Sequence, residues 1–275
     1  MKNVLRSGAD VRIMSSNIWG NCKKECPIAD RDDNLAVIYH RYLPDVIGMQ
    51  ECSPKSRAES PNIMDLVSDL YAEVEVTPTN EHHNNYTPIV YLKDKYTVLD
   101  KGWHYYSGLN DVGSKSVTWA VLENKTDLSR FIMVNTHYYW TSDDAGRAAR
   151  IENSREILAL YEGLREKYPY PAFFTGDFNC RTSEPPIQAL LAAGLQEARD
   201  AAPESSPYRS HHAYPTYDPE SGTYNTPITP SFEKELSIDH IFTHGTARAL
   251  AYEVIVDEES LLASDHCPIF IDAAL

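Results

Sequence analysis

Short apolar runs rich in β-branched residues recur from one end of the chain to the other, and they constrain the fold most. Strands are expected at 11–16, 45–49, 89–92, 117–122, 131–135, 172–175, 237–242 and 269–272. Apolar residues at helical spacing predict helices at 30–41, 60–70, 145–167 and 186–193. Because these helices interrupt the strands irregularly, a regular βαβ repeat fits poorly. We expect an α/β protein in which two sheets pack face to face with helices outside them.

The segment 203–230 is rich in Pro, Tyr, Ser and Thr and has no periodicity. Since strands of the same pattern resume after it, it is interpreted as a long surface loop and not as a linker. The chain has no internal repeat and no low-complexity tract. Residues 1–275 are therefore expected to form a single domain.

The composition limits the partners. Forty acidic residues against 25 basic ones give a formal net charge of −15, whereas tight nucleic-acid binding normally needs a basic surface. No apolar run is long enough to span a membrane, and no secretory signal is visible. We expect a cytoplasmic monomer, although a removed signal would leave export open. Among the five cysteines, Cys22 and Cys26 could pair or form half a metal site, but free thiols are favoured.

Polar residues follow or precede six of the apolar runs at one end. Singly, an Asp or Asn at a strand end is usually a turn former, and a lone His is usually structural. Together they indicate a site built on one edge of the sheets. The residues are Asn17, Glu51, His137, Asp177 with Asn179, Asp239, and Asp265 with His266.

These motifs resemble the endonuclease/exonuclease/phosphatase superfamily in a bacterial-type form. Its members include deoxyribonucleases, abasic-site endonucleases, inositol-polyphosphate 5-phosphatases and sphingomyelinases. The resemblance implies a four-layer α/β/β/α sandwich with two mixed, mostly antiparallel sheets. The matching stretches are Ser16–Trp19, Pro44–Glu51, Asn135–His137, Gly176–Asn179, Ile238–Phe242 and Ser264–Pro268.

The resemblance also implies roles within a metal-dependent hydrolase. Glu51, with Asn17 and Asp265 close by, would hold the metal, and such oxygen ligands suit Mg²⁺ or Mn²⁺. Asp239 would fix the tautomer of His266, and this pair would activate the attacking water or hold a phosphoryl oxygen. Three further residues would orient the nucleophile or contact the phosphoryl group: Asp177, Asn179 and His137.

Other candidates border this set. Arg147 and Arg150 stand near an Arg of relatives and are candidate substrate contacts, although a solvated helix face is the favoured interpretation. Tyr224 would border the substrate or pack on the sandwich. Lys115 stands where some bacterial relatives carry an Arg, which leaves the phosphate contact there open. The pairs His82–His83 and His211–His212 are interpreted as surface loop residues, with metal ligation as the alternative.

Three functions are compatible with these residues. We expect a phosphodiesterase or phosphatase that acts on a small or lipid-like phosphoester. A deoxyribonuclease-like nuclease is the alternative, disfavoured by the acidic balance and by the lack of Lys/Arg clusters interleaved with aromatics. A catalytically silent binding module is the least favoured, because the complete set of core residues has no evident structural purpose.

Overall fold

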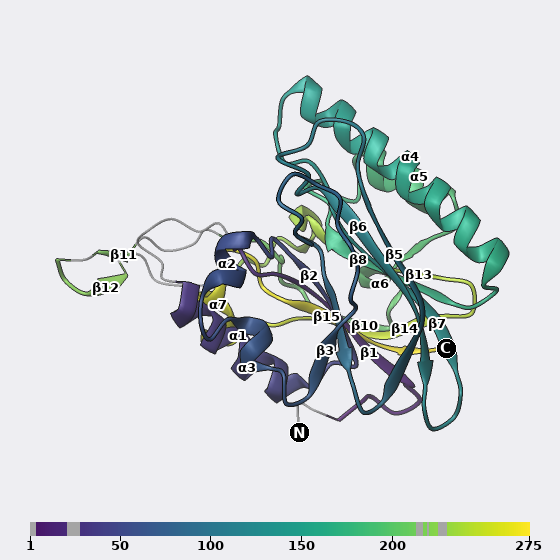
Figure 1. The fold of residues 1–275 in the computed structure, drawn as a ribbon, viewed down its shortest axis with the longest axis horizontal. Coiled ribbons are helices and arrows are strands. Elements are labelled where there is room, and N and C mark those ends of the chain that lie inside the picture. Colours follow the sequence, from purple (N-terminus) through teal and green to yellow (C-terminus); the bar gives the residue numbers. More distant parts are fainter. Residues whose placement is uncertain (1–3, 21–27, 213–216, 219, 225–229) are drawn as a thin grey trace.

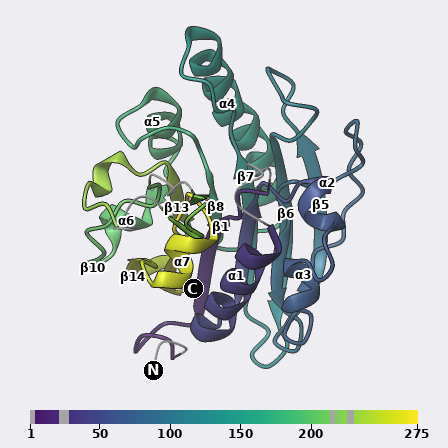
Figure 2. The same cartoon turned by 90° about the vertical axis from the view of Figure 1, so that its left-hand side faces the viewer.

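The computed structural model describes residues 4–20, 28–212, 217–218, 220–224 and 230–275. Two β-sheets lie face to face at its centre, and helices cover the outer face of each sheet (Figures 1 and 2). The expected four-layer α/β/β/α sandwich is confirmed. Three of the strand pairs are parallel and the others antiparallel, so both sheets are mixed and mostly antiparallel.

The first sheet has seven strands, and the N-terminal strand lies in its middle. Strand β1 (Val11–Asn17) pairs in antiparallel fashion with the C-terminal strand β15 (Ile269–Ala274) and in parallel with β2 (Val46–Gln50). In spatial order the strands are β10 (Glu204–Ser205), β14 (Arg248–Val254), β15 (Ile269–Ala274), β1 (Val11–Asn17), β2 (Val46–Gln50), β4 (Ile89–Leu92) and β3 (Tyr71–Glu73).

The second sheet has six strands, with β7 (Arg130–His137) and β8 (Ala172–Asp177) at its centre and β13 (Asp239–His244) beside β8. Strand β8 runs parallel to β7 and antiparallel to β13. In spatial order the strands are β5 (Tyr96–Tyr105), β6 (Ser116–Asn124), β7 (Arg130–His137), β8 (Ala172–Asp177), β13 (Asp239–His244) and β9 (Gln196–Glu197). A separate two-stranded ribbon joins β11 (Tyr217–Asp218) to β12 (Thr223–Tyr224).

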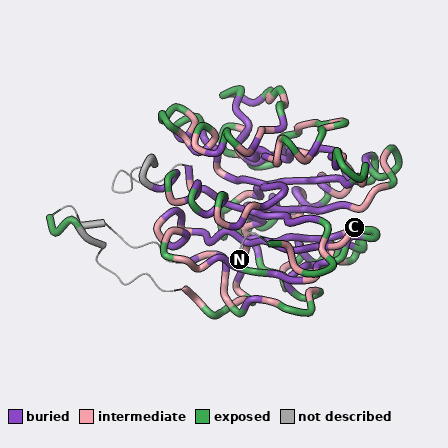
Figure 3. The backbone as a smooth tube through the Cα atoms, turned by 90° about the horizontal axis from the view of Figure 1, so that it is seen from below, coloured by how far each residue is buried: buried purple, intermediate pink, exposed green. Residues whose placement is uncertain are grey.

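The helices divide between the two outer faces. On the first sheet lie α1 (Ile28–Tyr42), α2 (Pro54–Ala58), α3 (Ile63–Leu66) and α7 (Glu258–Ala263), and on the second lie α4 (Asp144–Lys167) and α5 (Pro185–Ala192) (Figure 1). The short α6 (Ala198–Ala201) and the 3₁₀ turn η1 (Lys234–Leu236) lie near β13 and β14. The interior falls into one apolar cluster between the sheets and one under each helical layer. Figure 3 shows the strands as the buried centre.

Most predicted elements are confirmed, but the helix predicted at 60–70 is wrong. The helix there spans only Ile63–Leu66, because Asn62 and not Ser60 caps it: the Asn62 Oδ1 accepts from the N–H groups of Met64 and Asp65. The chain then enters β3 at Tyr71. The prediction also missed β5 and β14, and the segment 203–230 contains β10 and the β11–β12 ribbon.

The structure bears on two further expectations, the state of the cysteines and the lack of a membrane-spanning helix, for the described residues. Cys22 and Cys26 lie outside the described residues, whereas Cys52, Cys180 and Cys267 are buried free thiols, as favoured. Within the described part of the chain, no helix is long and apolar enough to cross a bilayer.

Candidate active site

The six polar strand ends meet at one edge of the sandwich. Asn17 ends β1, Glu51 follows β2, His137 ends β7 and Asp177 ends β8. In the second sheet, Asp177 stands opposite both His137 and Asp239 in the strand register. The resulting cavity of about 570 Å³ is lined by Trp19, Glu51, Tyr86, Asp111, Val112, Ser114, Lys115, His137, Trp140, Asp177, Asn179, His211, Ile238, Asp265 and His266.

A polar bridge between the two sheets supports the floor of this cavity. Asn135 on β7 donates to the Met49 carbonyl oxygen (2.6 Å) and accepts from Gln50 Nε2 (2.7 Å), both on β2. Gly48 makes this approach possible, since a Cβ there would lie 2.1 Å from the Thr175 hydroxyl and 2.5 Å from Asn135 Oδ1. The strands that carry Glu51, His137 and Asp177 are thereby fixed relative to one another.

The Asn17 amide links two carboxylates of the candidate metal site, those of Glu51 and Asp177. Its Nδ2 lies 3.2 Å from Glu51 Oε1 and 3.0 Å from Asp177 Oδ2. Glu51 has a positive φ of 61°, a strained conformation for a side chain of this kind, and such strain is concentrated at functional sites. Burial raises the pKa of Asp177 to about 7, with Asp239 adding to the effect.

His266 and Asp239 form a buried pair beside these carboxylates. His266 Nδ1 lies 2.8 Å from Asp239 Oδ2, and the Ser210 hydroxyl donates to the same oxygen at 2.6 Å. The other ring nitrogen, Nε2, lies 3.8 Å from Asp177 and 3.9 Å from Asp265. Burial disfavours the imidazolium, but these three carboxylates raise the pKa of His266 well above its ordinary value.

Lys115 and His137 form a second buried pair. Lys115 Nζ lies 3.0 Å from His137 Nε2, which in turn lies 3.4 Å from Asp177. Burial and the neighbouring ammonium hold the pKa of His137 well below its ordinary value, so its ring is neutral at pH 7. Burial also lowers the pKa of Lys115. Lys115, whose contact with phosphate the sequence left open, therefore lines the cavity.

The donor set of the cavity fits a divalent cation. Ligand atoms of Glu51, His137 and Asp177 lie within 4.8 Å of one another, as do those of His211, Asp265 and His266. Four carboxylates line the cavity: Glu51, Asp111, Asp177 and Asp265. Lys115 is the single Lys or Arg among the described lining residues, and together with the charged His266 ring it offsets only part of this negative charge, so a bound cation would favour a phosphate group here.

The predicted substrate-contacting residues do not join this set. Arg147 pairs with Asp144 on its own helix and donates to the Ser142 carbonyl. Arg150 is buried and donates to the carbonyl oxygens of Tyr139 (3.0 Å) and Thr141 (2.7 Å). Neither lines the cavity. Tyr224 lies on β12, and its side chain is outside the described part.

The 203–230 segment supplies residues that the sequence did not assign to the site. Ser210 holds Asp239, and the His211 ring packs at 4.8 Å on the His266 ring. Burial and His266 lower the pKa of His211 to about 4. His212 is buried, so the surface interpretation of this pair was wrong, whereas His82 and His83 are exposed as expected. No periodicity marks these loop residues, so no sequence signal separates them from other loop positions.

The sandwich, with acidic, amide and imidazole side chains converging on one edge, defines a phosphoester hydrolase. The model of the Endonuclease/Exonuclease/phosphatase family matches residues 14–266, and the chain belongs to this family. Its members are hydrolases that act on phosphoesters and depend on divalent metal ions. No curated protein matches the chain.

Several solved structures share the fold. A mannosyl-6-phosphatase from Bacteroides thetaiotaomicron has a TM-score of 0.71 and 21% identity, with 97% of this chain and 100% of that chain covered. The catalytic domain of human nocturnin with bound sulfate has a TM-score of 0.68 and 15% identity (98% and 96% covered). A truncated TDP2 from Caenorhabditis elegans has a TM-score of 0.68 and 19% identity (96% and 97% covered).

Proposed function

We propose that this chain hydrolyses a small or lipid-like phosphoester with the help of Mg²⁺ or Mn²⁺. The observation that carries the proposal is the convergence of Glu51, Asp177 and the His266–Asp239 pair on one cavity. Its volume of about 570 Å³ suits a compact substrate. Glu51, Asn17 and Asp265, which the family resemblance assigns to the metal, would hold the ion, and its positive charge would neutralise the phosphoryl oxygens and polarise the phosphorus centre.

Asp177 is the group best placed to accept a proton from the attacking water. Its buried carboxyl has a pKa of about 7, which is close to the ideal value for a general base at neutral pH. The Asn179 N–H donates to Asp177 Oδ1 (2.9 Å) and fixes the orientation of the carboxylate. The side-chain amide of Asn179 donates to the Tyr138 carbonyl oxygen (3.0 Å), which holds Asn179 at the cavity wall.

His266 would stabilise negative charge on the phosphoryl group. Asp239 accepts a hydrogen bond from the Nδ1–H group, which leaves the Nε2–H group free to point toward Asp177, Asp265 and the cavity. A charged imidazolium at this position is a preorganised donor for a phosphoryl oxygen. Lys115 adds a second positive charge, and the neutral His137 ring holds that ammonium in place.

Charge and size favour a small substrate over a polynucleotide. The net charge is −15, and the cavity carries four carboxylates against one lysine and one imidazolium. A nuclease is the second candidate, because Trp19 and the largely exposed Trp140 line the cavity and indole rings can stack on bases. The fold shared with a mannosyl-6-phosphatase is consistent with a sugar phosphate as substrate.

A substrate panel tests this proposal. We would compare kcat/KM on mannose 6-phosphate, inositol phosphates, sphingomyelin, bis-p-nitrophenyl phosphate and plasmid DNA with Mg²⁺ present. We expect hydrolysis of one or more small esters and little or no cleavage of DNA. DNA as the best substrate would establish the nuclease instead.

His266→Ala should lower kcat/KM on the best substrate by roughly 10²–10⁴-fold while leaving the fold intact. The matched control is His40→Ala, because His40 lies on the outer helix α1 and contacts Asp69 at 3.2 Å, remote from the cavity lining. Full activity in His266→Ala would refute the site assignment, whichever substrate is hydrolysed.

A further inference from the structure

The loop of residues 178–184, here called the β8 loop, carries Asn179 two residues after Asp177. Asn179 has a positive φ of 50°, and its N–H bonds to the Asp177 carboxylate. A residue in this conformation needs support from its surroundings. The next residue, Cys180, provides an anchor through its backbone carbonyl oxygen, which accepts a hydrogen bond from the side chain of His240.

His240 follows Asp239 on β13 and therefore points to the opposite face of the sheet. Its ring is only 1% exposed. Nδ1 lies 2.7 Å from Glu197 Oε1, and Nε2 lies 2.8 Å from the Cys180 carbonyl oxygen. An ionised carboxylate and a carbonyl oxygen only accept hydrogen bonds, so both ring nitrogens must donate. A ring that donates from both nitrogens is an imidazolium.

The charges around His240 agree with this protonation state. Burial disfavours the charged ring, yet the Glu197 carboxylate raises the pKa of His240 above its ordinary value. Despite its own burial, Glu197 has its pKa lowered to about 2 by His240 and Arg199. The Cys180 thiol, which also lies near Glu197, is buried, and burial raises its pKa well above its ordinary value.

The same hydrogen-bond network contacts both the β8 loop and the segment that leads into β13. Glu197 Oε2 accepts from the hydroxyl of Thr182 in the β8 loop at 2.7 Å. Arg199 donates to Thr182 Oγ1 (2.7 Å) and to the carbonyl oxygen of Lys234 (2.6 Å), just before β13. The buried ion pair therefore connects the segments that lead out of Asp177 and into Asp239.

We propose that His240, held between Glu197 and the Cys180 carbonyl, is a positioning residue that sets the β8 loop and so aligns Asp177 and Asn179 for hydrolysis. This inference rests on the proposed function of the cavity. His240 does not line the cavity, so it contributes through the loop and makes no contact with substrate. Loss of its two donors should reduce kcat much more than it changes KM, because the binding groups stay in place.

His240→Phe keeps a planar ring and removes both donors. We expect kcat on bis-p-nitrophenyl phosphate to fall roughly 10–100-fold, the scale on which a small misplacement of reacting groups acts, with KM changed less than about 3-fold. The matched control is His244→Phe on the same strand, where the half-buried ring contacts the Tyr161 hydroxyl at 2.8 Å. The control should keep its kcat. An unchanged kcat in His240→Phe, or equal losses in both variants, would overturn the proposal.

A measurement on the unaltered protein covers the case in which His240→Phe fails to fold. Long-range ¹H–¹⁵N NMR spectra should show both ring nitrogens of His240 protonated at neutral pH. A neutral tautomer would overturn the assignment. If His266→Ala also retains activity, the proposed function has failed; if only His240→Phe retains it, this inference alone has failed.

Discussion

At the scale of single residues, the site depends on carboxylates whose proton affinities burial has changed. Among the described residues, no ammonium or guanidinium group makes a hydrogen bond to Asp177, and an exposed aspartate at a strand end would be ionised in water at neutral pH. Burial instead raises its pKa to about 7. A general base of this kind is active only when ionised, so the carboxylate form should accumulate as the pH rises through 7.

The pH profile of kcat/KM therefore tests the role of Asp177. We expect kcat/KM to increase from about pH 5, pass its half-maximal value near pH 7 and level off above it. Asp177→Asn should lose roughly 10²–10⁴-fold in kcat/KM together with this acidic limb. A profile that stays flat over the same range in the unaltered protein would contradict the assignment.

Site residues at the ends of buried strands could be predicted from the sequence, whereas several site residues in loops could not. Asn17, Glu51, His137 and Asp177 end buried strands, and strand ends are recognisable where an apolar run stops. Lys115, Ser210 and His211 were missed or left open, because their positions depend on loops without periodicity. Arg150 faces the protein interior at carbonyl oxygens, an orientation that helical spacing alone does not specify.

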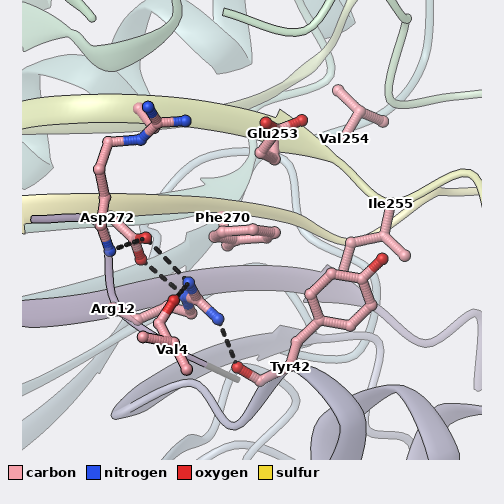
Figure 4. A pocket seen from close by; sticks show the side chains of 10 residues that line it. Val4, Arg12, Tyr42, Glu253, Val254, Ile255, Phe270 and Asp272 are labelled. Carbon is pink, nitrogen blue, oxygen red and sulfur yellow. Dashed lines mark hydrogen bonds and ion pairs between the residues drawn. The ribbon is translucent and has the colours of Figure 1, made fainter. Parts of the chain in front are cut away.

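At the scale of elements, a buried ion pair joins β1 and β15, which are the first and last strands along the chain and neighbours in the seven-stranded sheet. Figure 4 shows Arg12 of β1 beside Asp272 of β15. Arg12 Nε lies 2.6 Å from Asp272 Oδ1, and one terminal nitrogen lies 2.8 Å from Oδ2. The other terminal nitrogen donates to the Tyr42 carbonyl oxygen (2.6 Å), which attaches the end of α1.

Removal of one partner should be costly, because it leaves a buried charge uncompensated. We expect Asp272→Ala to lower the free energy of unfolding by about 3–5 kcal/mol, measured by urea titration. The double variant Arg12→Met/Asp272→Leu should recover much of this loss, since apolar replacements of similar volume avoid the unpaired charge. A cost for Asp272→Ala no larger than that of a surface substitution would contradict this account.

The elements themselves were predictable where burial was uniform. Strand β2 is buried at every position, so it appears in the sequence as a short, almost continuous apolar run. The edge strand β5 alternates largely between exposed and partly buried positions and has charged residues in the middle of its sequence, so the sequence analysis missed it. The 60–70 helix was overestimated because Ser60–Pro61 has the composition of a helix start, whereas the cap contacts are made by Asn62.

At the scale of the whole molecule, the negative net charge and the acidic cavity both disfavour the binding of an anionic substrate without a metal ion. A phosphate group would meet four carboxylates, one lysine and the His266 imidazolium at the cavity, on a chain of net charge −15. We therefore expect binding of an anionic substrate to depend on a bound cation. The sandwich could be predicted from the sequence because the motifs span it; that residues 1–275 form one domain stays a prediction.

The most direct test of this account is a Mg²⁺ titration of EDTA-treated protein, with hydrolysis of bis-p-nitrophenyl phosphate as the readout and Glu51→Gln as the comparison. We expect no hydrolysis without metal and saturable recovery with Mg²⁺. In Glu51→Gln the midpoint should rise roughly 10-fold or more, a loss seen even for residues that only support a metal ligand. Full hydrolysis in EDTA, or identical midpoints for the two proteins, would contradict a metal-dependent hydrolase centred on Glu51.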